Sequence, residues 1–474
     1  MGHLLTQEVL PLLKLAGVLF LVYLVASNLA TWYRLRRFRG PILARFSYLY
    51  MLRALLSGDR GQRYRNLYDE YGGETFLRIG PNDLLVSSPA MVRHMNSVRS
   101  PYLRSNWYRA QRIDPYRDNL LSLSDTAQHD KLKARLAAGY SGKENPAIET
   151  GVDEQLERLV ALIKRKYIST ASEFCPLDLA PTTMFFAVDT ISRIAFGKAF
   201  GNLDEDRDIY SFHKFAEVSS MKGSAFAEIP WLGKMFFFPP VLRLIGPKGS
   251  FVRYGVSPEQ CKSEIVFQIL AGSDTTAHAI RATMLNIITS PRVYERIRVE
   301  IDAAIADGRI QSSPAKAEEV KQLPYMQAVI REGLRFSPPT TALIQKQVPP
   351  EGDTFDDRFL PGGTRIAVSI LPIQRSKEVF GQDSEVFRPE RWLDISDEKY
   401  REMSQTVDQV FGWGRWQCLG KPVAMLELNK VFVELLRYFD FELVNTQSPW
   451  KSIDYTLYVV SDFWVRVTEK STSL

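Results

Sequence analysis

The residues with the clearest chemical potential in this sequence surround one cysteine, Cys418. It lies in the stretch FGWGRWQCLG, whose glycine-rich start is typical of a loop. The next residues, LGKPVAMLELNKVFVELL, are typical of a helix. A thiol at such a junction lies near a helix N-terminus, where the aligned backbone dipoles favour its thiolate form.

The alternative is that Cys418 is a small buried apolar residue, which is the usual role of a lone cysteine. Its neighbours favour a ligand site instead. The glycines around it let the backbone approach a flat or bulky group closely. Arg415 supplies a cation, and Phe411 and Trp416 supply apolar walls.

A long apolar segment, EIVFQILAGSDTTAHAIRATMLNIIT, is predicted to be a helix with polar residues at its centre. A polar group left unsatisfied in a buried helix costs about 1–3 kcal/mol, so the run SDTT needs a reason. One interpretation is that its hydroxyls bond back onto the helix and bend it. The other is that Ala271 and Gly272 leave room beside the helix, where Asp274 and Thr275 serve a proton path. The residues alone leave both interpretations open.

Two further segments carry charges that could meet. Glu332 and Arg335, in PYMQAVIREGLRFSPP, are three residues apart and share a helix face. Arg391 follows in VFRPERWLD, a loop from which it could reach a helical carboxylate. A surface pair would contribute about 0–1 kcal/mol. In a buried Arg–Glu–Arg cluster, the loss of one member would cost about 3–5 kcal/mol.

The elements that must position these residues are mainly helices, with a minor sheet. ETFLRIGPNDLLVSS is typical of two short strands around a turn, and Asp125 to Gly333 is mostly spaced as helices. Strand-like runs return in TRIAVSIL and, near the end, in DYTLYVVSDFWVRVTE. No repeat, low-complexity tract or long flexible linker divides the chain, so we expect one large domain.

Four motifs stand in order: AGSDTT, E-x-x-R, FRPERW and F-x-x-G-x-x-x-C-x-G. In this order and spacing, the sequence resembles the cytochrome P-450 family of heme-thiolate monooxygenases, and more narrowly its membrane-anchored fungal members of secondary metabolism. The resemblance extends from about residue 40 to the C-terminus. It implies the cytochrome P-450 fold and a reaction that inserts one oxygen atom from O₂ into a lipophilic substrate.

The resemblance also implies the cofactor, heme b (iron protoporphyrin IX), with Cys418 as the axial ligand of its iron. Such a thiolate supports cleavage of an O–O bond. The other positions that match heme contacts of the family are Phe411, Gly414, Arg415 and Gly420 in the cysteine loop, Ala271 and Gly272 in the long helix, His129 and Lys133 in HDKLKARLAAGYS, and Lys346 in LIQKQVPPEG.

Two further groups of residues gain roles from the resemblance. Asp274 and Thr275 match an acid–alcohol pair that faces bound oxygen and relays protons to it. Glu332, Arg335 and Arg391 match a buried charge cluster that braces the thiolate side of the heme.

The sequence departs from the family pattern in two places. The family has Arg or His two residues before the cysteine, in contact with a heme propionate, whereas this chain has Trp416. That contact is either missing or made by Arg415 from a shifted position. Relatives also have another long helix over the substrate pocket, just before the central helix. We expect a shortening of roughly 20–40 residues near 246–250.

The electrons would come from NADPH through a separate NADPH-cytochrome P-450 reductase, because the chain has no G-x-G-x-x-G dinucleotide loop. Cytochrome b5 is a second candidate donor. Arg415, Lys421 and Lys430 are predicted to form a basic docking face for an acidic partner. The substrate pocket is expected to include YLRSNWYRAQRIDPYRDNLL and PPTTALIQ, which suggests a mid-sized lipophile with some polar function.

Two other functions stay open. The first is a non-oxidative heme-thiolate isomerase or dehydratase that acts on a peroxide, which the intact pair Asp274 and Thr275 argues against. The second is a membrane-tethered heme binder without turnover, because the roof of its pocket is truncated.

The composition is that of a large globular protein. The 474 residues are 45% hydrophobic and 24% charged, so disorder is not indicated. Three cysteines argue against a disulfide scaffold and for reducing surroundings. A net charge of +6 is too small for nucleic-acid binding, and suits a basic patch that faces an acidic protein or an anionic membrane.

The N-terminus is predicted to anchor the protein in a membrane. Leu15 to Tyr33 has 19 residues without a charge, and as a helix it would span roughly 28 Å, close to a bilayer core. The arginines of RLRRFRG would stay cytoplasmic. A cleaved signal peptide is the alternative, but no small-residue cleavage site precedes this basic cluster. We expect residues 1–39 to form a single-pass anchor in the endoplasmic reticulum, and residues 40–474 to form the catalytic domain facing the cytosol.

Overall fold

The computed structural model describes residues 25–142, 147–238, 240–242 and 258–470, with single positions between 15 and 23. The predicted membrane helix, Leu15 to Tyr33, lies partly outside the described residues. The predicted shortening near 246–250 lies wholly outside them. In the described part, no helix has both the length and the apolar content that crossing a membrane requires.

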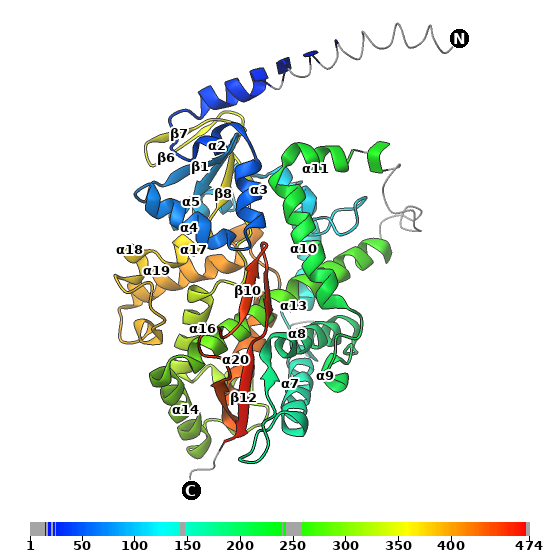
Figure 1. The fold of residues 1–474 in the computed structure, drawn as a ribbon, viewed down its shortest axis with the longest axis vertical. Helices are drawn as coiled ribbons and strands as arrows, with labels where there is room; N and C mark the ends of the chain where they lie inside the picture. The colour runs from blue at the N-terminus through cyan, green and yellow to red at the C-terminus, as the bar shows by residue number, and fades with distance from the viewer. Residues whose placement is uncertain are drawn as a thin grey trace, which may run out of the picture.

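The body is mainly helical with a smaller sheet component, as predicted (Figure 1). Its longest described helix is α13, Pro258–Ile288. The other described α-helices are α2 (Ile42–Phe46), α3 (Leu49–Leu56), α4 (Arg60–Glu70), α5 (Pro89–Asn96), α6 (Thr126–Tyr140), α7 (Ala147–Lys166), α8 (Leu179–Phe196), α9 (Asn202–Glu205), α10 (Phe212–Glu228), α11 (Pro230–Phe236), α14 (Pro291–Ala306), α15 (Ala317–Val320), α16 (Pro324–Phe336), α17 (Ile370–Gln374), α18 (Lys377–Phe380), α19 (Asp397–Val407) and α20 (Lys421–Tyr438). Short 3-10 helices are η1 (Asn106–Gln111), η3 (Pro389–Trp392), η4 (Asp408–Phe411) and η5 (Gly414–Trp416).

The described strands form one five-stranded sheet, one three-stranded sheet and two hairpins. The five-stranded sheet has the order β1 (Phe76–Gly80), β2 (Asp83–Val86), β8 (Arg365–Val368), β5 (Lys346–Gln347), β3 (Leu103–Arg104). The three-stranded sheet has the order β4 (Leu177–Asp178), β12 (Trp464–Glu469), β9 (Phe439–Leu443), and the hairpins are β6 (Asp353–Phe355) with β7 (Arg358–Leu360) and β10 (Lys451–Asp454) with β11 (Tyr458–Ser461).

The five-stranded sheet joins early and late parts of the chain. The strands β1 and β2 form the predicted antiparallel hairpin, and β2 continues the sheet by pairing in parallel with β8. The short strand β5 lies between β8 and β3 and is antiparallel to both. This topology places Arg104 directly opposite Lys346, although 241 residues separate them in the sequence.

Helix α13 crosses the centre of the helical body and packs against α8, α16 and α20 (Figure 1). Its side chains at Ile280, Met284 and Ile287 recur at helical spacing and are fully buried. They join the largest apolar core together with Phe186 of α8 and Leu436 of α20. The helix is therefore a rigid support for the polar residues at its centre.

The loop that carries Cys418 ends where α20 begins. Proline follows at the second position of α20, in the first turn, where the N–H that proline lacks would have no partner inside the helix. Gly420 is the residue just before the helix, so Cys418 lies three residues before the first residue of α20. The predicted order of loop, cysteine and helix is present in the structure.

Candidate active site

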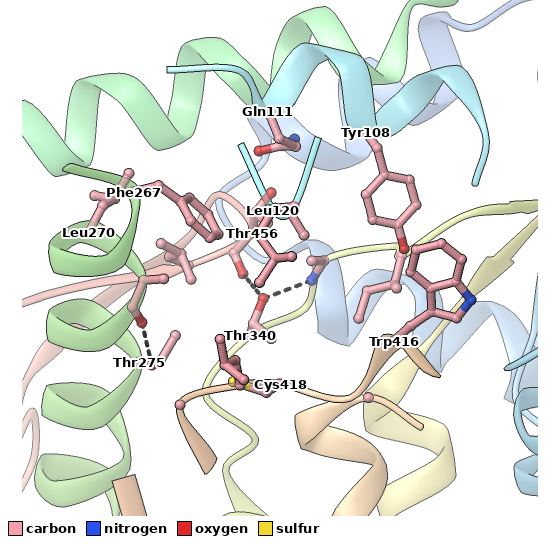
Figure 2. Close-up of a pocket in the computed structure, with 18 of the residues that line it drawn as sticks. Tyr108, Gln111, Leu120, Phe267, Leu270, Thr275, Thr340, Trp416, Cys418 and Thr456 are labelled. Carbon is pink, nitrogen blue, oxygen red and sulfur yellow. Dashed lines mark hydrogen bonds between the residues drawn. The ribbon is translucent and has the colours of Figure 1, made fainter. Parts of the chain in front are cut away.

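A cavity of about 600 Å³ lies between the first half of α13 and the loop that carries Cys418 (Figure 2). Its walls are mostly apolar and aromatic, and they include Tyr108 and Phe267. Residues from both segments that were expected to line the pocket, 102–121 and 338–345, border the cavity. The structure therefore brings one thiol to the wall of a largely apolar chamber.

The side chain of Cys418 is exposed, and the surface that it exposes belongs to this cavity. Its backbone N–H donates to the carbonyl oxygen of Phe411 at 2.6 Å, which closes the loop. Burial raises the pKa of the Cys418 thiol, and the backbone N–H groups of Gly420 and Lys421 offset part of that rise. A bound metal ion would supply the remaining stabilisation of the thiolate.

The glycines of the loop allow its tight path. Gly414 has φ +57, and a Cβ atom there would lie 2.3 Å from the carbonyl oxygen of Asn96 at the end of α5. A Cβ at Gly420 would lie 3.8 Å from Sγ of Cys418, in ordinary contact. Any side chain at position 414 would therefore push the loop away from α5, and with it the cavity wall that Phe411 forms.

The central polar run of α13 shows parts of both interpretations. The Thr275 hydroxyl donates to the carbonyl oxygen of Ala271 at 2.7 Å, which is the bond back onto the helix. Thr275, Ala271 and Gly272 also line the cavity. At Gly272, a Cβ atom would lie 3.3 Å from Cγ1 of Ile191 on α8, so the small residue also permits the close approach of two helices.

Asp274 lies on a different face of α13 from Thr275. It is buried but does not border the cavity. Burial raises its pKa to about 7, and the nearby Arg281 only partly opposes that rise. The structure therefore separates the expected acid–alcohol pair, because only the alcohol reaches the cavity.

A buried carboxyl that the sequence reasoning missed, Glu427 on α20, does border the cavity. The Thr276 hydroxyl donates to its Oε2 at 3.4 Å, while Oε1 has no partner among the described residues. Burial raises the pKa of Glu427 well above its usual value, which favours the protonated carboxyl. The available signal was a carboxyl four residues after Val423, on the same face of the predicted helix.

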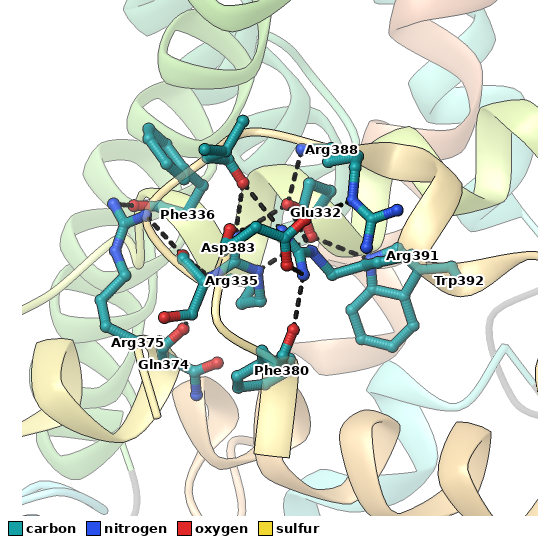
Figure 3. A network of polar contacts seen from close by, with 12 residues as sticks. Glu332, Arg335, Phe336, Gln374, Arg375, Phe380, Asp383, Arg388, Arg391 and Trp392 are labelled. Carbon is teal, nitrogen blue, oxygen red and sulfur yellow. Dashed lines mark hydrogen bonds and ion pairs between the residues drawn. The ribbon is translucent and has the colours of Figure 1, made fainter. Parts of the chain in front are cut away.

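The three charged residues Glu332, Arg335 and Arg391 form one buried cluster (Figure 3). Arg335 donates to both oxygens of Glu332, at 2.8 and 2.7 Å, and Arg391 donates to Oε1 at 3.0 Å. The indole N–H of Trp392 and the backbone N–H of Arg388 complete the set at 3.0 and 2.9 Å. Of the two interpretations of this sequence, the geometry is that of the buried cluster.

Burial alone would raise the pKa of Glu332, but Arg335 and Arg391 outweigh it and hold the pKa below its usual value. The carboxylate is therefore ionised and fully bonded. The cluster joins α16 to η3 and the loop before it, which supports the body behind the cysteine loop.

The residues predicted on α6 lie beside the cysteine loop. Lys133 donates from Nζ to the carbonyl oxygens of Arg415 and Gln417, both at 2.7 Å, so it braces that loop. His129 borders the cavity and lies 4.3 Å from the ring of Trp416, centroid to centroid. Burial lowers the pKa of His129 to about 4, so its ring is neutral.

Arg415, the alternative predicted for the missing propionate contact, makes its described polar contacts outside the cavity. It is not among the residues that border the cavity. Its Nη2 donates to the carbonyl oxygen of Val98 at 3.0 Å, and its Nε lies 3.2 Å from Asp130. The ring of Trp416 instead faces two other cations, Arg104 and Lys346. Arg104 was missed as a site residue, although it lies in a segment expected to line the pocket.

One of the three residues of the predicted basic docking face, Lys430, is not at the surface. Lys430 is fully buried, because it pairs with Glu149 and Asp153 of α7 at 2.8 and 2.6 Å. Lys421 remains partly exposed and pairs with Asp408 at 2.8 Å. The prediction was wrong for Lys430, because Glu149 and Asp153 neutralise its charge in the interior of the protein.

The residues present fit a heme. Cys418 offers one soft sulfur donor to an iron at the wall of the cavity, and the apolar walls suit a porphyrin. Arg104 and Lys346 are buried cations suited to its carboxylates. This combination of a helical fold, a thiol on a glycine loop and an apolar chamber defines a heme-thiolate protein.

The comparison with protein families agrees with this class. The family model described as "Cytochrome P450" matches residues 40–248 and 253–461. The chain belongs to the cytochrome P450 family, whose named relatives here are monooxygenases, and it is an oxygen-incorporating oxidoreductase.

Two curated relatives are similar over nearly their whole length. Cytochrome P450 monooxygenase ABA1 of Pyricularia oryzae is 42% identical, over 96% of this chain and 97% of the relative. Cytochrome P450 monooxygenase aba1 of Botryotinia fuckeliana is 38% identical, over 92% of each chain. Among solved structures, the cytochrome P450DA heme domain superposes with a TM-score of 0.72 at 17% identity, over 91% of this chain and 98% of that chain, which shows the shared fold.

Proposed function

We propose that the protein is a membrane-tethered monooxygenase that inserts one oxygen atom from O₂ into a lipophilic small molecule of secondary metabolism, with heme b as cofactor. The observation that carries this proposal is that Cys418 and Thr275 border the same cavity, whose walls are otherwise mostly apolar. Such a chamber binds a substrate by burying its apolar surface and excludes water from the reaction.

The bound heme would supply the activation of O₂, supported by the electron density of a thiolate ligand. The protein's own residues would hold it and manage protons. Cys418 would hold the iron, and Arg104 and Lys346 would lie near the carboxylates. Thr275 Oγ1 is the hydroxyl of the predicted pair that borders the cavity, so it would hold or hand on a proton there.

Asp274 would act as a proton store behind the helix. With a pKa of about 7, its carboxyl takes up and releases protons near neutral pH. Because the side chain does not border the cavity, its proton would travel through water or through a change of its rotamer. This role separates Asp274, which stores the proton, from Thr275, which presents it.

The electrons would come from NADPH through NADPH-cytochrome P450 reductase, with cytochrome b5 as a second donor. Arg415 and Lys421, both partly exposed beside the thiolate loop, would form the remaining basic docking face for an acidic partner.

The N-terminal residues 1–39 would anchor the protein in the endoplasmic reticulum, with the catalytic domain facing the cytosol. Supporting this, apolar side chains at described positions of the predicted anchor helix, such as Leu15, Leu19 and Leu29, are exposed, whereas Leu35 and Phe38 after it are buried. Beyond the exposed arginines of RLRRFRG, α2 exposes further apolar residues, among them Ile42 and Phe46. Exposed apolar side chains beside exposed cations are typical of a membrane contact.

The experiment that tests this function measures NADPH consumption by the purified full chain with a reductase, while lipophilic candidate substrates are added. We expect substrate-dependent consumption and a product with one added oxygen atom. An isomerase or dehydratase would convert a peroxide without NADPH or reductase. A heme binder without turnover would show the thiolate spectrum and no substrate-dependent consumption. Either of these last two results would overturn the proposal.

A further inference from the structure

Glu264, in the first half of α13, is a buried carboxyl beside the cavity that the proposed reaction does not use. The residue is 3% exposed, and neither of its carboxyl oxygens has a hydrogen-bond partner among the described residues. Buried side-chain polar atoms in folded proteins usually have such a partner. The carboxyl of Glu264 is therefore a buried polar group whose hydrogen bonds are still to be made.

Glu264 also lacks a compensating cation within the described part of the chain. Burial raises its pKa to about 7, and the backbone N–H of Leu120 opposes only part of this rise. That N–H makes no hydrogen bond of normal geometry with the carboxyl. Glu332 differs, because two arginines bond its oxygens. A buried carboxyl without such partners destabilises the free protein, and a shifted group in a cavity is typical of a functional site.

Glu264 lies on the same face of α13 as Thr275. A row of cavity-lining residues connects the two at helical spacing, and it includes Phe267 and Ala271. Figure 2 shows Phe267 and Thr275 on this helix beside the cavity. Thr275 comes three turns after Glu264, so equivalent atoms of the two residues lie roughly 16 Å apart along the helix axis. The same wall of the cavity therefore carries a carboxyl at one point and the Thr275 hydroxyl well away from it.

A second unsatisfied polar group lies in the cavity wall, near the loop that contains Leu120. The Nε2 atom of Gln111, in η1, is buried without a partner among the described residues, and Gln111 borders the cavity (Figure 2). The backbone carbonyl oxygen of Gln111 accepts from Nδ2 of Asn119, the residue before Leu120, at 3.1 Å. A hydroxyl can donate to a carboxylate and accept from an amide N–H, whereas an ammonium can only donate. The two unsatisfied groups therefore favour a ligand that carries a hydroxyl.

We propose that Glu264 is a specificity-determining residue, which binds a hydroxyl of the substrate and so directs the opposite end of the substrate toward Thr275. This inference rests on the proposed function and narrows its substrate class. The substrate is an elongated lipophile whose hydroxyl lies on the order of 10–15 Å from the carbon that is oxidised, because the rise of α13 separates the two residues by a similar distance. The hydroxyl donates to the carboxylate and gives it the partner that it lacks in the free protein.

The test uses iron ligands of two lengths. An N-alkyl imidazole binds the heme iron through its free ring nitrogen, and the absorption spectrum of the heme reports that binding. Two pairs of ligands are compared, with a decyl or a butyl chain that ends either in a hydroxyl or in a methyl group. The decyl chain has the length that the proposal requires, whereas the butyl chain is too short.

In the unmodified holoprotein, the terminal hydroxyl should tighten binding of the decyl imidazole roughly 10-fold to 100-fold, the effect of a hydrogen bond to a charged group. It should give no such gain with the butyl chain. Glu264→Leu removes the acceptor at a similar side-chain volume, so it should abolish the gain for the decyl pair. Glu295→Leu, at an exposed carboxylate of α14, is the matched control and should keep the gain.

The stability of the holoprotein without any imidazole gives an independent measurement. Because Glu264 is buried without a partner, Glu264→Leu should raise the denaturant midpoint. A carboxyl that supports the fold would respond in the opposite direction. An unchanged or lower midpoint in Glu264→Leu would therefore assign the residue to the fold and overturn the proposal.

The proposal is also wrong if the hydroxyl gives no gain with the decyl chain in the unmodified protein, or if Glu264→Leu keeps that gain. An equal gain with the butyl and decyl chains would overturn it as well, because the hydroxyl would then bind elsewhere. A failure of the proposed function looks different. An unmodified protein without a thiolate-bound heme gives no spectral response to any of the imidazoles.

Discussion

At the scale of single residues, three buried carboxyls show how surroundings decide chemistry. Glu332 is ionised because Arg335 and Arg391 bond both of its oxygens. Asp274 has its pKa raised to about 7, since burial outweighs the nearby Arg281. Glu427, with one hydroxyl partner, has its pKa raised well above its usual value by burial. The first therefore supports structure, whereas the other two can hold protons near the cavity.

Glu332→Gln should lower the free energy of unfolding by about 3–5 kcal/mol, because it leaves Arg335 and Arg391 buried without a carboxylate. Denaturant titration followed by far-UV circular dichroism measures this. The control is Glu318→Gln, which removes another carboxylate bonded to a cation three residues later, Lys321 at 2.7 Å, but in an exposed pair. That control should change stability by less than about 1 kcal/mol. Equal effects of the two variants would contradict a buried, structural cluster.

Asp274→Asn should change how stability depends on pH. A carboxyl whose pKa is raised in the folded state binds its proton more tightly there than in the unfolded chain. Its contribution is therefore full below the unfolded pKa of 3.8 and is lost as pH rises toward about 7. Removing the group should flatten this decline, which amounts to at most about 1.4 kcal/mol per pH unit.

Denaturant titrations of Asp274→Asn and the unmodified protein, across this pH range, provide the measurement. If the two proteins show the same dependence of stability on pH, the pKa of Asp274 is the same in the folded and the unfolded state. Its proposed role as a proton store then loses its basis.

At the scale of elements, α10 forms a wall of the cavity and is held in place by a buried ion pair. Arg60 of α4 donates to Glu228, the last residue of α10, at 3.0 Å, and both side chains are fully buried. One turn earlier, the Ser224 hydroxyl lies 2.5 Å from that of Thr456, which borders the cavity. These contacts fix the end of α10 against α4 and the turn between β10 and β11.

Glu228→Gln should loosen α10, because it leaves Arg60 buried beside a neutral amide. Amide hydrogen exchange in residues 212–228 should become faster, while exchange in α20 should stay unchanged. Glu205→Gln, which breaks the exposed pair with Arg207 at 3.7 Å, is the control and should leave α10 protected. Unchanged exchange in α10 of Glu228→Gln would show that the ion pair does not hold the wall.

The elements were largely predictable because their signals are local. The hairpin of β1 and β2, the helix α13 and the junction at Cys418 follow from turn residues, periodicity and a glycine loop. The sequence also allowed the prediction that Asp274 and Thr275 point in different directions, because adjacent residues of a helix point about 100° apart.

Contacts between distant segments were not predictable in the same way. Lys430 is buried because α7 brings two carboxylates to it. Arg104 reaches Trp416 because β3 pairs with β5, and nothing near either residue in the sequence indicates that pairing. These features depend on which elements pack together, which single-residue patterns do not encode.

At the scale of the whole molecule, the fold brings together segments from four regions of the chain. The pair β3 and β5 supplies cations, α13 supplies the hydroxyl of Thr275, and the loop before α20 supplies the thiol. The N-terminal segment is proposed to hold this assembly at a membrane. Membrane attachment through this segment should therefore be separable from heme binding.

Deletion of residues 1–39 should shift the protein from the membrane pellet to the supernatant after ultracentrifugation of expressing cells, since it removes the proposed anchor. The absorption spectrum of the bound heme should not change, because no residue assigned to the heme lies in this segment. If the shortened protein still sediments fully with membranes, the exposed apolar residues of α2 and its neighbours are sufficient for attachment, and the proposed anchor is not required.

The central claim is that Cys418 binds the iron of a heme. The most direct measurement is the absorption spectrum of the reduced, carbon monoxide-treated protein, compared between the unmodified chain and Cys418→His. The unmodified protein should show the red-shifted Soret band of a thiolate ligand, and Cys418→His should show the band of an imidazole ligand instead. A red-shifted band that persists in Cys418→His, or an unmodified protein without it, would contradict the account.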